Sequence, residues 1–123
     1  QRVSGDVLML NGSSACFRDD GSDDLDLRID NGELHPTAVL WGDGETMATD
    51  DCEVLESAVV DRYPIFKQGL PAARVEQQRR AMRLRVDDID CRQEASDLVL
   101  TFSLLAGSYA TMVLREIVNL REN

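Results

Sequence analysis

The residues best suited to chemistry lie near the end of the chain, between positions 102 and 116. An apolar run stops at Gly107, and Ser108, Tyr109 and Thr111 follow before a helical pattern begins. This order predicts a turn from a strand into a helix, with one aromatic ring and two hydroxyl groups at the turn. Such a ring could stack on an unpaired base. The alternative is that Tyr109 packs in the core from the first turn of the helix.

A second set of candidates consists of arginines in the middle of the chain. Residues 74–92 hold six of the 13 basic residues. We predict that Arg83 and Arg85 share one face of a strand, where they could contact successive phosphates, and we select Arg80 and Arg83 as candidate substrate-binding residues. The alternative is that these arginines pair with nearby acidic residues such as Glu76.

Motifs for other chemistries are absent from the sequence. No GxxxxGK or GxGxxG occurs, which excludes the usual nucleotide-binding loops. His35 is the only histidine, so neither a His-based metal site nor a Ser–His pair is available. We therefore predict no cofactor, no metal site and no catalytic histidine. The three cysteines are widely separated, which is typical of reduced intracellular thiols.

The formal net charge of −10 is unevenly distributed. Residues 1–61 carry 15 acidic and 3 basic residues, whereas residues 62–123 carry 8 acidic and 10 basic residues. Only the second half is therefore expected to bind a phosphate backbone, and the total by itself argues against a nucleic-acid-binding protein. The longest apolar runs are far shorter than the roughly 20 residues that span a bilayer, so we predict no membrane partner.

The residue pattern in the first half predicts a mixture of strands and helices. Residues 5–10 and 14–18 form a hairpin around Asn11-Gly12, and a short helix carries Leu25 and Ile29. Residues 35–44 are predicted to be a loop. A helix beginning at Asp50 or Asp51 then carries four apolar residues at helical spacing, and a shorter helix follows between Pro64 and Pro71. The four are Val54, Leu55, Ala58 and Val59.

The second half changes to an alternating pattern. Residues 80–86 and 98–104 are predicted to be antiparallel strands, and residues 89–93 would either extend the first of them or form a bent strand. Ser108 is predicted to cap the last helix. The inner stripe of that helix would consist of Tyr109, Met112, Val113, Ile117 and Leu120. The fold class is α+β, with antiparallel or mixed strands and packed helices.

Three segments resemble, in order, the TruD family of transfer-RNA pseudouridine synthases. Residues 5–13 are similar to the family's "GD-v-m-l-x-G-s" stretch and residues 40–45 to its "lWGxGe". Residues 79–82 and 102–116 together are similar to "RRxm … F-x-LPxGSYATxVLRE", which is the longest and most specific match. Leu105 stands where the family usually has proline.

The resemblance implies an enzyme that isomerises the uridine at position 13 of transfer RNA without cofactor or metal. It implies that Tyr109 contacts the substrate and that Gly107 and Ser108 shape its approach. The family's catalytic aspartate lies in an upstream motif, and no aspartate of this chain matches it. No catalytic residue is therefore assigned here.

The resemblance also implies how the chain is organised. Residues 1–78 would be the distal part of an inserted domain, and residues 79–123 would be the end of the catalytic domain of a pseudouridine-synthase-like fold. The chain would be a cytoplasmic fragment, inactive without the missing N-terminal half, with transfer RNA and that half as its partners. The competing hypothesis is a small acidic α+β interaction module without RNA chemistry.

Overall fold

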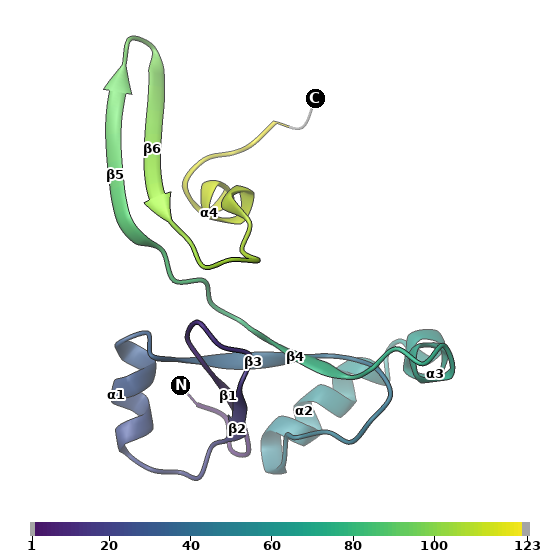
Figure 1. Ribbon diagram of the computed structural model, residues 1–123. Coiled ribbons are helices and arrows are strands. Elements are labelled where there is room, and N and C mark those ends of the chain that lie inside the picture. Colours follow the sequence, from purple (N-terminus) through teal and green to yellow (C-terminus); the bar gives the residue numbers. More distant parts are fainter. Residues whose placement is uncertain (1, 122–123) are drawn as a thin grey trace. The chain divides into compact units, whose positions relative to one another are not determined.

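The computed structural model describes residues 2–121 and divides into two compact units, with the division between Arg83 and Leu84. In chain order (Figure 1) the elements are β1 (Val7–Leu10), β2 (Cys16–Arg18), α1 (Asp24–Asp30), β3 (Leu34–Leu40), α2 (Asp50–Val60), α3 (Pro64–Ala72), β4 (Gln78–Ala81), β5 (Asp87–Glu94), β6 (Asp97–Ser103) and α4 (Ala110–Ile117). This content, with antiparallel strand pairs, confirms the predicted α+β class.

The first unit is built on a four-stranded antiparallel sheet with the strand order β2-β1-β3-β4. The predicted hairpin supplies β1 and β2, with Leu8 opposite Phe17. The prediction of a loop over residues 35–44 is wrong in its first part, because β3 lies inside the sheet. Pro36 of β3 has no N–H to donate, but its carbonyl oxygen still accepts a hydrogen bond from the Met82 amide at 2.8 Å.

Two small apolar clusters lie on opposite faces of this sheet. Val7 and Leu8 are neighbours in a strand, so their side chains point to opposite faces, and both are fully buried. On the Leu8 side, α1 contributes Leu25 and Ile29, as its spacing predicted. On the Val7 side, α2 contributes Cys52. The sheet is therefore covered by a different helix on each face.

Helix α2 packs with the opposite face from the one its sequence predicts. Its buried residues are Cys52 and Val60, whereas Val54 is 69% exposed and Leu55 and Val59 are also exposed. Apolar residues at helical spacing usually mark the face of a helix that packs on a core, but this face of α2 is exposed. A polar residue of the same helix takes their place against the sheet, as the site below describes.

The strand predicted over residues 80–86 ends at Ala81. Just beyond it, the Arg83 guanidinium donates hydrogen bonds of 2.7 Å to the carbonyl oxygens of Ile29 and Leu34. These bonds join the end of α1 to the start of β3, and at Ile29 they add a second donor to a carbonyl oxygen that already accepts the Gly32 amide at 3.1 Å. Arg83 and Arg85 consequently do not share a strand face, which corrects the sequence prediction.

The second unit consists of the β5–β6 hairpin and α4. The two strands pair in antiparallel register, with Cys91 opposite Leu100. The strand predicted over residues 98–104 is confirmed as β6, but its partner is β5 and not the strand predicted over residues 80–86. Among the described residues of this unit, Val113 is the only one that is buried. A lone two-stranded hairpin is marginally stable in water, so this unit has little core of its own.

Helix α4 differs from its prediction in two respects. Tyr109, not Ser108, occupies the N-cap position, and it makes no side-chain capping bond. Of the five residues predicted to form the inner stripe, four are exposed, because only two strands accompany the helix in its unit. Across residues 2–121, no helix has the length and apolar character needed to cross a bilayer.

Two glycines allow a matched test of this packing. Gly5 and Gly21 both have φ near +80°, at 76° and 81°, but a Cβ on Gly5 would collide with the Thr49 carbonyl group while one on Gly21 would meet nothing within 4 Å. Gly21→Ala should cost only the backbone term of about 1–2 kcal/mol, and Gly5→Ala about 2 kcal/mol more. Urea unfolding followed by the fluorescence of Trp41 measures both. Equal losses for the two variants would contradict the close approach.

Candidate functional site

The turn between β6 and α4 contains three of the residues predicted to bind substrate. Gly107 has φ of 86°, and a Cβ there would meet nothing within 4 Å. Glycine is therefore favoured at position 107 by the left-handed backbone conformation and not by a lack of space for a side chain. The Ser108 amide closes the turn with a 3.1 Å hydrogen bond to the Leu105 carbonyl oxygen. Ser108 thus acts through its backbone, while its side chain is half-buried.

Tyr109 lies where the chain leaves this turn and enters α4. Its backbone is extended, with φ of −111° and ψ of 119°, and its carbonyl oxygen accepts the Met112 amide at 3.0 Å. Its side chain is 64% exposed. Within the described part of the chain the ring is thus outside the core, which contradicts the core-packing alternative. An exposed ring on a helix terminus is available to stack on a base.

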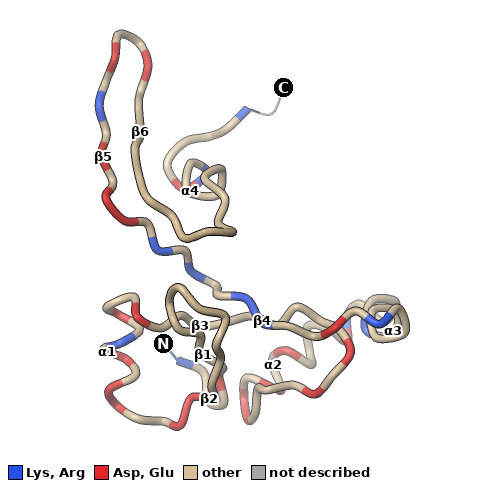
Figure 2. The backbone as a smooth tube through the Cα atoms, viewed as in Figure 1, with Lys and Arg blue, Asp and Glu red and all other residues tan. Residues whose placement is uncertain are grey.

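The two candidate arginines lie in the first unit, whereas the turn lies in the second. Figure 2 shows the run of basic residues along which the chain leaves β4. Arg80 is exposed on β4 and pairs through its backbone with Ala38. Arg83 is exposed too, but one of its terminal nitrogens is already bonded to two carbonyl groups. The structure therefore gives Arg83 a clear structural role, and its contact with substrate stays a prediction.

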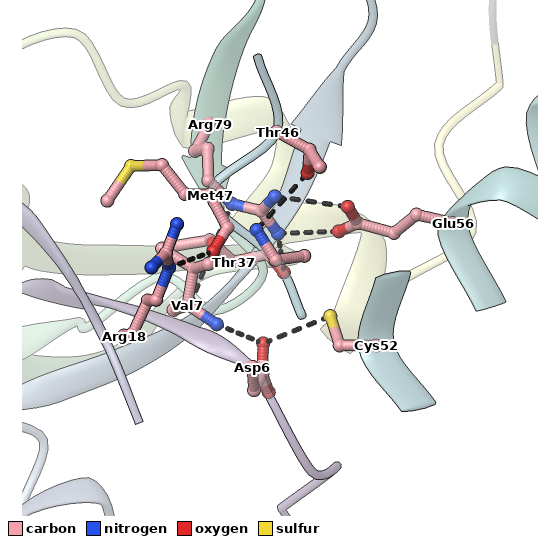
Figure 3. Close-up of polar contacts among 10 residues, drawn as sticks. Asp6, Val7, Arg18, Thr37, Thr46, Met47, Cys52, Glu56 and Arg79 are labelled. Atoms are coloured by element: carbon pink, nitrogen blue, oxygen red, sulfur yellow. Dashed lines mark hydrogen bonds and ion pairs between the residues drawn. The ribbon is translucent and has the colours of Figure 1, made fainter. Parts of the chain in front are cut away.

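The best-developed polar cluster surrounds Arg79 (Figure 3). Its guanidinium forms two hydrogen bonds with Glu56 of α2, with Nη1–Oε2 at 3.1 Å and Nη2–Oε1 at 2.5 Å. Its Nε donates to Thr37 Oγ1 at 2.7 Å, and that hydroxyl donates to the Val7 carbonyl oxygen at 2.7 Å. The Arg79 and Glu56 side chains are only 5% and 14% exposed. One side chain thus links β4, β3 and α2.

The adjacent positions of Arg79 and Arg80 already indicate part of this arrangement. Arg79 and Arg80 are adjacent in a strand, so their side chains must point to opposite faces, and one of them must face the covered side of the sheet. Nearby acidic residues are one set of partners predicted for these arginines, and Arg85 does pair with Asp87 at 2.9 Å. The partner of Arg79 is 23 positions away, and no local pattern could identify it.

A buried thiol and a buried carboxyl lie beside this pair. Asp6 Oδ1 accepts the Val7 amide at 2.8 Å and lies 3.8 Å from Cys52 Sγ. Burial raises the pKa of Asp6 above its ordinary value, against the opposing effects of the Val7 hydrogen bond and the Arg79 charge. Burial, together with the Glu56 and Asp6 charges, raises the pKa of Cys52 to about 11.

The side chains of this cluster are suited to holding β4 and α2 together and not to taking part in a chemical reaction. Glu56 raises the pKa of Arg79 although burial alone would lower it, so the guanidinium stays charged. The Cys52 thiol stays protonated at neutral pH and is a poor nucleophile. Across residues 2–121, no three His, Cys, Asp or Glu side chains gather in a way that could hold a metal ion. The cluster fixes β4, and thereby leaves Arg80 on the exposed face.

The comparisons with known proteins agree on one family. The family model for tRNA pseudouridine synthase D (TruD) matches residues 1–117. The chain is 37% identical over 120 residues to a tRNA pseudouridine synthase D of Hydrogenovibrio crunogenus, and 40% identical over 118 residues to that of Methylococcus capsulatus. These alignments cover 97% and 94% of the chain but 35% and 33% of the relatives. The chain therefore spans about a third of the length of these curated relatives.

A solved structure shares the fold. The crystal structure described as that of a tRNA pseudouridine synthase D from Methanosarcina mazei superposes with a TM-score of 0.70 at 24% identity. The match covers 94% of this chain and 31% of that chain.

The ion pair at Arg79 leads to a stability prediction. Glu56→Ala removes the carboxylate and leaves a buried guanidinium unpaired, which should lower the free energy of unfolding by about 3–5 kcal/mol. Glu94→Ala is a matched control, because its pair with Arg92 is 58–62% exposed and should contribute at most about 1 kcal/mol. Urea titrations followed by circular dichroism compare the two. Similar losses in both variants would contradict the importance of the buried pair.

The thiol leads to a reactivity prediction. Raising the pKa of Cys52 from 9.0 to about 11 lowers its thiolate fraction about 100-fold, and burial adds to this effect. With iodoacetamide at pH 8, Cys52 should react at least about 100-fold more slowly than the exposed Cys91. Mass spectrometry of the alkylated peptides over time measures both rates. Comparable rates would show that Cys52 is accessible and ionised.

Proposed function

Because this chain belongs to the TruD family of tRNA pseudouridine synthases, we propose that it is the C-terminal portion of an enzyme that isomerises uridine to pseudouridine in transfer RNA. We further propose that its target is uridine 13. In this isomerisation the C1′–N1 glycosidic bond is replaced by a C1′–C5 bond, and the C5 proton is lost as N1 gains one. Atoms and electrons balance without any redox partner.

The single observation that supports this function best is the exposed ring of Tyr109 beside the left-handed Gly107. A uridine must leave its stack before its glycosidic bond can be reached, at a cost of a few kcal/mol. Stacking on an aromatic side chain returns about 1–3 kcal/mol per base. Tyr109 would therefore hold the extruded uridine, while Gly107 and the Ser108 amide set the turn from which the ring projects.

The remaining proposed contacts are between arginine side chains and RNA phosphates. Arg80 would contact a phosphate from the exposed face of β4, held there because Arg79 is fixed on the other face. Arg83 would lie close to the same backbone while it stabilises α1 and β3. These contacts would place the RNA strand without reading its sequence.

The catalytic aspartate would come from the part of the family that this chain does not span. The relatives are about three times as long as the chain, so the proposed partner is a missing upstream part of about two-thirds of the enzyme, which is more than the N-terminal half expected from the sequence. Residues 1–78 would belong to the inserted domain and residues 79–123 to the catalytic domain. In that case β4 would pair with β3 of the inserted domain before the chain enters the second unit at Leu84.

Tyr109 provides the test of this function. Residues 1–123 would be joined to the upstream two-thirds of the Methylococcus capsulatus relative. Tyr109→Ala should then lower the rate of pseudouridine formation about 10- to 100-fold, because the stacking partner is lost. Tyr109→Phe retains the ring and should keep most of the rate, and Met112→Ala serves as a neighbouring exposed control.

Chemical detection of pseudouridine in an unmodified transfer RNA measures these rates. Unchanged turnover in Tyr109→Ala, with the parent chimera active, would reject the role of Tyr109. Absence of pseudouridine formation by a folded parent chimera would instead favour the interaction module.

A further inference from the structure

Helix α3 and its flanks form a basic stretch that directly follows the acidic first half of the protein. Residues 62–75 contain no aspartate or glutamate and carry three basic residues, Arg62, Lys67 and Arg74. By contrast, residues 1–61 carry 15 acidic and 3 basic residues. The basic positions on α3 are visible in Figure 2. An acid-free basic segment in such surroundings is the natural place for a polyanion to bind.

The same segment exposes aromatic side chains. None of the residues of α3, all of which the structure describes, is buried. Tyr63 and Phe66 are 55% and 60% exposed. Tyr63 is the N-cap of α3, and the Lys67 amide donates a 2.9 Å hydrogen bond to its carbonyl oxygen, so Tyr63, Phe66 and Lys67 lie within one turn of the chain. Two rings and a cation are therefore presented together.

The helix is held in place without using these side chains. Trp41 Nε1 donates a 3.1 Å hydrogen bond to the backbone carbonyl oxygen of Lys67. The Val75 amide donates to the Leu70 carbonyl oxygen at 3.1 Å and closes the end of the helix. Because the anchors are mainly backbone groups, the exposed rings and charges are not needed for packing.

We infer that α3, together with Arg62 and Arg74, is a second RNA-contact surface that binds an unpaired segment of the RNA substrate. Tyr63 and Phe66 stack on bases, and Arg62, Lys67 and Arg74 contact phosphates. Rings interleaved with cations are the combination that binds single-stranded RNA with little dependence on sequence. This inference rests on the proposed function only in taking RNA as the ligand.

One competing contact has to be displaced. Lys67 Nζ pairs with the Asp61 carboxylate, and the two side chains are 44% and 56% exposed. A surface pair of this kind contributes little in water, so a phosphate can replace the carboxylate as the partner of Lys67. The apolar residues of α2 lie among acidic ones, such as Asp51 and Glu53, and they do not offer the same surface to RNA.

The experiment measures binding of a short unstructured RNA to the full 123-residue chain as a function of salt. The triple variant R62Q/K67Q/R74Q should bind more weakly and lower the slope of log K against log salt by about 2 to 3. The double variant Y63A/F66A should weaken binding roughly 10-fold or more without changing the slope, because rings release no counterions. Arg28→Gln and Arg92→Gln are the controls, since both arginines are exposed and pair with glutamates.

Trp41 supplies a check on folding, because its indole is bonded to α3. Its emission should be unchanged in the unbound variants and should change when the wild-type chain binds RNA. Absence of RNA binding by the folded wild-type chain, or equal slopes for wild type and triple variant, would overturn the inference. So would a change of oligomeric state in Y63A/F66A with RNA binding intact, which would identify a protein interface. None of these results bears on pseudouridine formation by the chimera. The proposed function is therefore tested independently.

Discussion

The buried charge of Arg79 is the constraint on which the first unit depends. A guanidinium that is 5% exposed requires a carboxylate and further acceptors, and Glu56 and Thr37 supply them. Since Glu56 must therefore face the sheet, α2 is turned so that Cys52 packs beside it. Residues on the far side of the helix, Val54 and Leu55, are then exposed although they are apolar. The orientation of α2 thus agrees with the ion pair and with the burial of Cys52 and Val60, and not with the spacing of Val54 and Leu55.

The same constraint organises the surface. Arg79 and Arg80 point to opposite faces of β4, so fixing the first on the covered face exposes the second. Arg83, two residues after β4, ties the end of α1 to β3. The arginines of this region are thus divided between structural bonds and exposed charge. Composition alone could not divide them, because all have the same side chain.

The second unit depends on backbone hydrogen bonds more than on a buried core. Its hairpin and helix carry one buried side chain, Val113, and the proposed stacking residue projects from a turn that backbone groups define. Gly107 adopts the left-handed conformation, and the Ser108 amide bonds to Leu105. A ring placed in this way can be exposed because its position depends on the backbone and not on burial in a core.

The sequence by itself determined the local elements and the family. The β1–β2 hairpin, α1 with Leu25 and Ile29, and strand β6 follow from turn residues and from the spacing of apolar residues, which are local properties. The pairing of β6 with β5 does not follow in this way. The long match around Tyr109 indicated TruD, and the comparisons confirm it. Tertiary structure alone decided which face of α2 is buried. The strand at His35, the outward apolar face of α2 and the 23-residue link from Glu56 to Arg79 all depend on partners distant in sequence. Periodicity shows that a helix has two faces, but only the available partner determines which face is covered.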